Sequence, residues 1–418
     1  MTEQTRIGVV GLGYVGLPLA LAMTEAGYRV VGVDIDADRI ASLRDGVSYV
    51  NDVSDDALER ALTAGFEPTT EYDALDSVDA VSICVPTPMR KSGSPNLSYV
   101  ASAAESLAEI IPEGCTVILE STVYPGATEE FVAETLTENG LTVGEDIFVA
   151  FSPERIDPGN EQYGPTDIPK VLGGVTEACG DRAEALYAPV FNEVVRVDSA
   201  TEAELVKLLE NTFRAVNIGM INELATVANE FDADIWNVVD AAATKPFGFM
   251  PFYPGPGLGG HCIPIDPFFL SWKARQFGTT AHFIQRAGEV NTAMTDFVTR
   301  KITEGLNLHR KPVNGSDILV LGVAYLLAQG FADAAPRALT RRMALYSVAT
   351  AVAYFGLQTG AARLTAGTLP PTPAPGPLEW FLLVLIVIGF AGVAVLQWLL
   401  PLWANHPAAA SLRVHLAN

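Results

Sequence analysis

The chain has 418 residues, which is too long for a single hydrophobic core and predicts several domains. It carries 26 basic and 49 acidic residues, a formal net charge of −23. Such a surface repels phosphate backbones, which argues against a nucleic-acid-binding protein. Lys is scarce among the basic residues. Because an acidic, Lys-poor surface suits a salt-rich cytoplasm, we expect a halophilic source.

The four Cys residues (Cys84, Cys115, Cys179 and Cys262) stand far apart, without a CxxC motif or a Cys/His cluster. We therefore expect no metal site and no disulfide framework. The first residues, MTEQTRIGVV, lack a cationic start followed by an apolar run. They do not predict a secretory signal, and we expect a cytoplasmic protein.

The first predicted elements form a strand, a Gly-rich turn and a helix. Residues 6–10 are an apolar run typical of a buried parallel strand. The motif GLGYVG follows at 11–16, and apolar residues recur at helical spacing over 17–26. A second strand is predicted at 28–33, and Asp34 closes it, 18 residues after the third Gly of the motif.

This arrangement is the fingerprint of a dinucleotide-binding site. Gly11 permits the tight turn, Gly13 lets the backbone approach a pyrophosphate, and Gly16 lets the helix pack on the strand. The helix N-terminus offers free N–H groups to the phosphates. Asp34 can accept from a ribose 2′-OH and repels a 2′-phosphate, which favours NAD over NADP. The alternative is a Gly-rich turn without a ligand.

Polar turns follow three further predicted strands. Strands at 80–85 and 116–120 each end in such a turn, and a third ends at residue 151, shortly before Glu154 and Arg155. In a doubly wound sheet these strand ends line the ligand crevice. A carboxylate and a guanidinium there can orient water and bind an anionic substrate, although the same pair is also typical of a surface ion pair.

The longest helical pattern runs from residue 200 to residue 230. Lys207, Asn211 and Arg214 fall at positions i, i+4 and i+7, on one face of this helix. Two cations and an amide on one stripe can face a nucleotide diphosphate. The alternative is a stripe of solvated polar side chains.

Residues 254–266 (PGPGLGGHCIPID) predict a tight loop, because they hold four Gly and three Pro. Cys262 lies inside this loop, directly after His261 and four residues before Asp266. A Cys in this setting can act as a covalent nucleophile that nearby charges activate. The alternative, a small buried apolar side chain, fits the other three Cys residues better.

Over residues 1 to about 325, the chain resembles the UDP-glucose/GDP-mannose dehydrogenase family, because six motifs occur in the family's order. They are GLGYVG (11–16), VPTP (85–88), STVYPG (121–126), SPER (152–155), KLLEN (207–211) and the Cys262 loop. Four segments resemble the UDP-N-acetylhexosamine branch: GGHCIP (259–264), SPERIDPGN (152–160), PKVLGG (169–174) and DPFFLSWK (266–273). UDP-glucose enzymes more often have Ser before the Cys.

The resemblance implies oxidation of the C6 alcohol of a UDP-sugar to a carboxylate by two hydride transfers to NAD, in polysaccharide biosynthesis and glycosylation. The substrate would be UDP-N-acetylmannosamine or UDP-N-acetylglucosamine. Cys262 would form a thiohemiacetal and then a thioester. Lys207 and Asn211 would exchange protons and stabilise oxyanions. Asp266 would orient or deprotonate nearby groups, and Thr122 and Glu154 would position the hydrolytic water.

The resemblance also implies the ligand contacts and the assembly. The implied NAD contacts are Gly11, Gly13, Tyr14, Val15, Gly16, Asp34, Arg39, Thr87 and Thr122. The implied substrate contacts are Arg155, Ile156, Lys207, Asn211, Arg214, Gly259 and Tyr325. The helix at 200–230 would form a homodimer.

Three domains are implied by the resemblance. We expect an α/β Rossmann domain with a doubly wound sheet at 1–190 and a central helical domain at 191–312. A third, Rossmann-like domain that binds UDP should follow, and its first strand is present at 317–325. After Tyr325 the family has a Lys, an acidic stretch and Arg-Glu-Ser-Pro, whereas this chain continues as LLAQG. We therefore expect 313–325 to be the remnant of a truncated third domain.

The composition changes at the same place, so we expect 326–418 to be an unrelated apolar tail. It has five basic and two acidic residues, against 21 basic and 47 acidic before it. Residues 380–403 carry no charge and are long enough to cross the roughly 30 Å hydrocarbon core of a bilayer. The stretch at 343–362 is either a second membrane segment or a buried Ala-rich helix.

Two origins of the tail are open: a frameshift, insertion or assembly error, or a genuine membrane-tethered derivative. Two classes of function follow. One is an NAD-dependent UDP-N-acetylhexosamine 6-dehydrogenase, impaired by the truncation, with a UDP-glucose enzyme as its variant. The other is a catalytically dead, membrane-associated protein that binds NAD or oligomerises.

Overall fold

The computed structural model describes residues 5–138, 140–155, 166–260 and 262–318. The chain divides into two units: unit 1 is Met1–Arg214 with Cys262–Gln285, and unit 2 is Ala215–His261 with Arg286–Asn418.

Several predictions concern residues outside this description. They are the substrate contacts Ile156 and Tyr325, most of the third-domain remnant, and the whole tail with its two membrane segments. Among the helices of the described residues, none combines the length and apolar character needed to cross a bilayer.

Unit 1 is built on a sheet of eight strands in the described residues, in the order β3-β2-β1-β4-β5-β6-β7-β8. All neighbouring strands are parallel except β6 and β7. The strands are β1 (Arg6–Val10), β2 (Arg29–Val33), β3 (Phe66–Thr69), β4 (Ala80–Ile83), β5 (Thr116–Leu119), β6 (Phe148–Phe151), β7 (Lys170–Gly174) and β8 (Val194–Val197). The strand order reverses between β1 and β4, and ligands of such sheets bind at that point, beyond the carboxyl ends of the strands.

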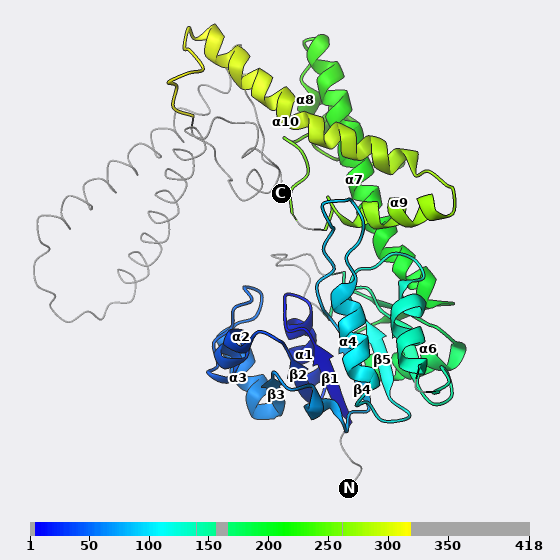
Figure 1. Ribbon diagram of the computed structural model, residues 1–418. Helices are drawn as coiled ribbons and strands as arrows, with labels where there is room; N and C mark the ends of the chain where they lie inside the picture. The colour runs from blue at the N-terminus through cyan, green and yellow to red at the C-terminus, as the bar shows by residue number, and fades with distance from the viewer. Residues whose placement is uncertain (1–4, 139, 156–165, 261, 319–418) are drawn as a thin grey trace, which may run out of the picture. The chain divides into compact units, whose positions relative to one another are not determined.

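The central strands β1, β4, β5 and β6 are buried on both faces, which explains why they are mostly apolar runs. Successive residues point to opposite faces: Ile7 and Val9 belong to one core cluster, and Val10 belongs to the other. The described helices between the strands (Figure 1) supply further members of both clusters. They are α1 (Gly16–Glu25), α2 (Ala37–Arg44), α3 (Asp55–Ala64), η1 (Tyr72–Leu75), α4 (Ser98–Ala108), η2 (Thr128–Ala133), α5 (Glu134–Thr137) and α6 (Glu177–Tyr187).

Helix α7 (Ala200–Glu230) begins in unit 1 and continues into unit 2. Its first turns complete one core of the sheet through Ala203 and Leu208. Helix α9 (Asp266–Gln276) returns to the same core through Phe269. Unit 1 therefore contains both the N-terminal half of the long helix and the segment that follows the predicted Cys loop.

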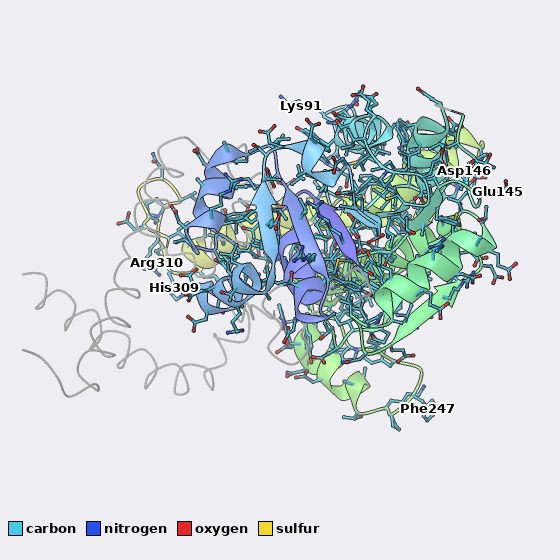
Figure 2. All side chains as sticks on the ribbon, turned by 90° about the horizontal axis from the view of Figure 1, so that it is seen from below. Lys91, Glu145, Asp146, Phe247, His309 and Arg310 are labelled. Atoms are coloured by element: carbon cyan, nitrogen blue, oxygen red, sulfur yellow. The ribbon has the colours of Figure 1, made fainter. Side chains whose placement is uncertain are left out.

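In unit 2, the second half of α7 packs against α8 (Ile235–Ala243) and α10 (His282–Leu308). A Cβ at Gly219 would lie 3.0 Å from the Ala287 Cα of α10, so the absence of a side chain allows the close approach. Asn222 donates to Asn291 across these helices at 2.8 Å. Figure 2 shows Phe247, which projects outward from the loop after α8 and is exposed.

The prediction of a Rossmann-like α/β sheet joined to a helical region is confirmed. The predicted strands at 80–85 and 116–120 are shorter, since both end before the polar turn. The antiparallel pairing of β6 with β7 was not predicted. The direction of β7 depends on how the chain returns to the sheet before residue 170, and the apolar sequence of residues 170–174 does not encode it.

Candidate active site

The glycines of the 11–16 motif have different environments. Gly11 has φ +91°, and a Cβ there would lie 2.8 Å from the carbonyl oxygen of Cys84. A Cβ at Gly16 would lie 1.9 Å from the Gly11 oxygen. A Cβ at Gly13, by contrast, would meet no heavy atom of the described residues within 4 Å. Gly11 and Gly16 are thus required by packing, whereas Gly13 leaves room for a ligand beside the backbone.

Asp34, at the end of β2, is buried and holds this loop in place. One carboxylate oxygen accepts from the Leu12 N–H at 2.9 Å, and the other accepts from the Asp36 N–H at 3.0 Å. Arg39 Nη1 lies 3.5 Å from the first oxygen. Asp36 caps α2 by accepting from the backbone of Asp38 and Arg39, which fixes the direction of the Arg39 side chain.

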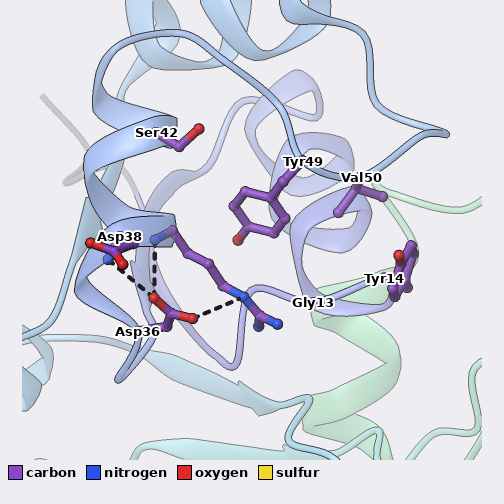
Figure 3. A pocket seen from close by; sticks show the side chains of 8 residues that line it. Gly13, Tyr14, Asp36, Asp38, Ser42, Tyr49 and Val50 are labelled. Carbon is purple, nitrogen blue, oxygen red and sulfur yellow. Dashed lines mark hydrogen bonds and ion pairs between the residues drawn. The ribbon is translucent and has the colours of Figure 1, made fainter.

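A pocket of about 420 Å³ opens beside Gly13 and Arg39 (Figure 3). Its lining residues are Gly13, Tyr14, Asp36, Asp38, Arg39, Ser42, Tyr49 and Val50. The place and the lining fit the adenosine half of a dinucleotide, because the pocket lies next to the 11–16 loop and Asp34. We call this loop together with Asp34 the dinucleotide cradle. Sequence reasoning missed Ser42, Tyr49 and Val50, which carry no motif and reach the pocket only through the fold.

Tyr49 forms one wall of the pocket. Its hydroxyl donates to the Leu12 carbonyl at 2.5 Å, and the Arg39 guanidinium lies over its ring. Burial and the Asp34 carboxylate raise the pKa of Tyr49 to about 12. The hydroxyl therefore remains a neutral donor, and the ring stays a fixed surface at physiological pH.

The other predicted cofactor contacts lie at the edges of this cradle. Tyr14 is exposed at the pocket, and Val15 caps α1. Thr87 and Thr122 are half-buried in the turns after β4 and β5. The Ser121 hydroxyl donates to the Val85 carbonyl at 2.6 Å and ties these two turns together.

The end of the Cys loop, residues 262–266, and the N-terminal half of α7 meet within unit 1. Asn211 Nδ2 donates to Asp266 Oδ2 at 2.7 Å, and both side chains are only 4% exposed. Arg214 Nη2 donates to Asn211 Oδ1 at 2.7 Å. The backbone N–H of Asp266 donates to the Cys262 carbonyl at 2.8 Å, so Cys262 lies one turn before α9. The structure thus brings together the Cys and the predicted α7 stripe.

The Cys262 side chain is exposed, unlike those of the other three Cys residues. Desolvation by the surrounding protein and the Asp266 carboxylate raise the pKa of the Cys262 thiol, while Lys207 and Arg214 oppose the rise. The resting thiol is therefore protonated at neutral pH, and a nearby group must take its proton before it can attack carbon.

Glu154 and Arg155 follow β6 and have different partners. Arg155 binds Glu210 of α7 at 2.6 Å and the Pro169 carbonyl at 2.9 Å. Glu154 lies 3.2 Å from the Nζ of Lys170 and accepts from the backbone N–H of Arg155 at 2.6 Å. Sequence reasoning assigned no role to Lys170, although this residue belongs to the PKVLGG segment (169–174) that carries part of the family resemblance. Gly259, a predicted substrate contact, belongs to unit 2.

Comparisons with known proteins agree with this geometry. The NAD binding domain of the UDP-glucose/GDP-mannose dehydrogenase family matches residues 5–191, and the central domain of that family matches residues 201–293. The UDP-N-acetyl-D-glucosamine 6-dehydrogenase of Pseudomonas aeruginosa is 38% identical over 327 residues, 77% of this chain and 76% of that protein. The UDP-N-acetyl-D-mannosamine dehydrogenase of Pyrococcus horikoshii is 36% identical over 323 residues, again 77% and 76%.

Solved structures give the same result. The UDP-D-ManNAc dehydrogenase from Pyrococcus horikoshii matches with a TM-score of 0.71 at 35% identity, over 77% of this chain and 76% of that one. A UDP-glucose dehydrogenase from Pyrobaculum islandicum matches with a TM-score of 0.64 at 28% identity, over 74% and 72%. The predicted NAD cofactor and oxidoreductase class are confirmed, and the chain belongs to the UDP-glucose/GDP-mannose dehydrogenase family.

Proposed function

We propose that the chain is an NAD-dependent 6-dehydrogenase of a UDP-N-acetylhexosamine. The observation that carries the proposal is the Asn211–Asp266 hydrogen bond, which joins α7 to the Cys262 loop in the same unit as the dinucleotide cradle. The names of the two curated relatives, one acting on the glucosamine and one on the mannosamine derivative, support this class of sugar.

The cradle favours NAD over NADP, because the buried Asp34 carboxylate would repel a 2′-phosphate. Gly13 leaves space for the pyrophosphate, and Arg39 and Tyr49 enclose the adenosine pocket. When bound, NAD⁺ takes up one hydride from the sugar C6 in each of the two oxidations.

Cys262 supplies the covalent step of the proposed reaction. Its Sγ bonds to C6 of the aldehyde to give a thiohemiacetal, whose oxidation leaves a thioester, so no free aldehyde escapes. Lys207 and Asn211, on one face of α7, stabilise the oxyanion that develops on the C6 oxygen. Asp266 accepts a hydrogen bond from Asn211 at 2.7 Å, and this bond orients the Asn211 amide beside the thiol.

Water completes the reaction. Thr122 and Glu154 position a water whose oxygen bonds to C6 while the C–S bond breaks and the thiolate leaves. One alcohol, two NAD⁺ and one water give one carboxylate, two NADH and three protons. Arg155 and Arg214 supply positive charge near the phosphates of the substrate.

The test is NADH formation by the full chain with UDP-N-acetylglucosamine, UDP-N-acetylmannosamine and UDP-glucose. We expect two NADH per acid formed and a higher kcat/KM with one of the N-acetylated sugars. The full chain with NAD⁺ and no UDP-sugar is the control for background reduction of NAD⁺. A higher kcat/KM for UDP-glucose would overturn the sugar assignment, and the absence of NADH with all three sugars would overturn the activity.

We also propose that the chain forms a homodimer through α7. Large apolar side chains on this helix are exposed at spacings of three, four and seven residues, so they share a face. They are Leu209, Phe213, Met220, Leu224 and Val227. A second copy of the same helix would cover this face. Sedimentation should show a dimer for the parent and a monomer for Leu224→Glu, whereas an unchanged dimer would contradict the assignment.

A further inference from the structure

A buried charge network lies behind Glu154. Lys170, the first residue of β7, is 4% exposed, and its Nζ contacts Glu120 Oε2 at 2.6 Å and Glu154 Oε2 at 3.2 Å. Glu120 follows β5 and is 1% exposed. On its other side, Glu120 accepts from the Tyr187 hydroxyl at 2.5 Å, and that hydroxyl lies 3.0 Å from the Ser82 Oγ.

The network keeps a cation in the protein interior. Burial by itself would lower the pKa of Lys170, but the Glu120 and Glu154 carboxylates raise it above its ordinary value. Burial also raises the pKa of Glu120, and Lys170 opposes that rise. An ammonium group buried this deeply costs several kcal/mol in desolvation, roughly, unless carboxylates compensate it.

Glu154 is the end of the network that solvent can reach. Its side chain is 12% exposed, against 4% for Lys170 and 0% for Glu120. One of its oxygens faces the Lys170 ammonium and the other accepts from the Arg155 N–H. Two donors on the two oxygens fix the plane of the carboxylate, so its direction depends on Lys170.

We propose that Lys170 is a positioning residue that aims the Glu154 carboxylate at the hydrolytic water, so that it governs thioester hydrolysis and not the preceding oxidations. The inference rests on the proposed function. In that step the water oxygen bonds to C6, the Cys262 sulfur leaves as thiolate, and Glu154 takes one water proton. The acid loses the second proton when it ionises.

The test separates the oxidations from hydrolysis. Lys170→Met/Glu120→Gln removes one positive and one negative charge, so the net charge of the network is unchanged. Lys273→Met/Glu130→Gln removes another Lys–Glu ion pair of unit 1, which does not contact Glu154, and is the matched control. Each full chain is mixed with NAD⁺ and the preferred UDP-N-acetylhexosamine by stopped flow, and intact mass spectrometry follows the Cys262 adduct.

We expect the Lys170 variant to form two NADH per Cys262 in a burst close to the parental rate. The steady-state rate should then be slower by about 30-fold or more, because the variant loses part of the 10²–10⁴ that a positioned base contributes. The mass of the thioester adduct should accumulate on Cys262. The steady-state rate of the control variant should stay within about threefold of the parental rate, as expected for an ion pair away from the reaction. KM for the UDP-sugar should fall together with kcat, because the enzyme accumulates as the thioester, so kcat/KM should stay near the parental value.

If the burst rate and the steady-state rate fall by the same factor, Lys170 has a merely structural role and the inference is overturned. A parental steady state would also overturn it. If thermal melting shows that the Met variant does not fold, Lys170→Gln/Glu120→Gln replaces it, because Gln keeps a neutral donor at position 170. The same parental burst and slow steady state are expected for this variant. Absence of NADH from the parent would instead overturn the proposed function, and the inference with it.

Discussion

The dinucleotide cradle and the Cys262 cluster both lie in unit 1, but they use different parts of the chain. In the cradle, backbone groups form the surface: Gly11 and Gly16 permit close packing, and Gly13 leaves space for the ligand. In the cluster, side chains that are 55 residues apart meet, as Asn211 and Asp266 do. Changes in the cradle should therefore act on cofactor affinity, whereas changes in the cluster should act on turnover.

Cys262→Ser tests this division most strongly. We expect acid formation to fall by at least about 10³-fold, because the covalent step needs the thiolate. The dissociation constant for NAD⁺, measured by calorimetry, should stay within about twofold since no cradle atom changes. Acid formation at the parental rate would show that Cys262 is not the nucleophile.

Glu204 links α7 to the turn after β5 and gives a pH-dependent stability. Its carboxylate accepts from Gly126 N, Thr128 N and Thr128 Oγ1. Burial raises the pKa of Glu204 to about 7, and these hydrogen bonds oppose the rise. Because the folded pKa lies above the unfolded value of 4.5, the stability contribution is full below pH 4.5 and is lost as the pH rises toward 7.

The loss amounts to about 3 kcal/mol for a shift of this size. Urea unfolding of the parent and of Glu204→Gln is measured at pH 5 and at pH 8. The free energy of unfolding of the parent should exceed that of the variant by more at pH 5 than at pH 8. Glu202→Gln, an exposed change in the same helix, is the control. An advantage of equal size at both pH values would contradict the raised pKa.

Gly16→Ala should lower the stability of the fold, whereas Gly13→Ala should lower the affinity for NAD⁺. A Cβ at position 16 collides with the Gly11 oxygen, so we expect a loss of about 2–3 kcal/mol in the free energy of unfolding. A Cβ at position 13 meets open space, so stability should change by less than about 0.5 kcal/mol. NAD⁺ affinity should nevertheless fall about tenfold in Gly13→Ala, because the added methyl group keeps the pyrophosphate from the backbone. Unchanged affinity would place the phosphates elsewhere.

Asn211→Ala should lower kcat by about 10–100-fold, the equivalent of one lost hydrogen bond to a charged group. The buried Asp266 carboxylate would lose the hydrogen bond from Asn211, and the oxyanion would lose a co-donor. NAD⁺ affinity should not change. Asn291→Ala removes a buried Asn of α10, which donates to the Ala215 carbonyl, and serves as the control, with lower stability and a nearly normal kcat. Equal kcat losses in both variants would contradict the assignment.

Asp34→Asn should narrow the preference for NAD⁺ over NADP⁺ by about tenfold, which corresponds to about 1.4 kcal/mol of repulsion. The amide keeps an acceptor for the loop but carries no charge. Equal affinities of the parent for the two cofactors would remove the basis of the prediction.

The cradle could be predicted from the sequence because it is local. Residues 11–16 and Asp34 belong to consecutive elements, and the requirement for Gly follows from backbone geometry that any Rossmann turn shares. The helix at 200–230, the Cys262 loop and the family could likewise be read from motifs and spacing. The domain boundaries and the roles of the site residues remain predictions.

Only the tertiary structure decided which side chains meet. Tyr49 reaches the adenosine pocket because α2 turns it back over the Gly loop, and no motif marks it. Lys170 contacts Glu120 and Glu154 because β7 returns beside β6, from residues that are 50 and 16 positions away. Spacing along the chain cannot encode such contacts, since they depend on strand order and direction. The sequence by itself therefore determined the NAD cofactor and the family, and the fold determined which buried charges meet.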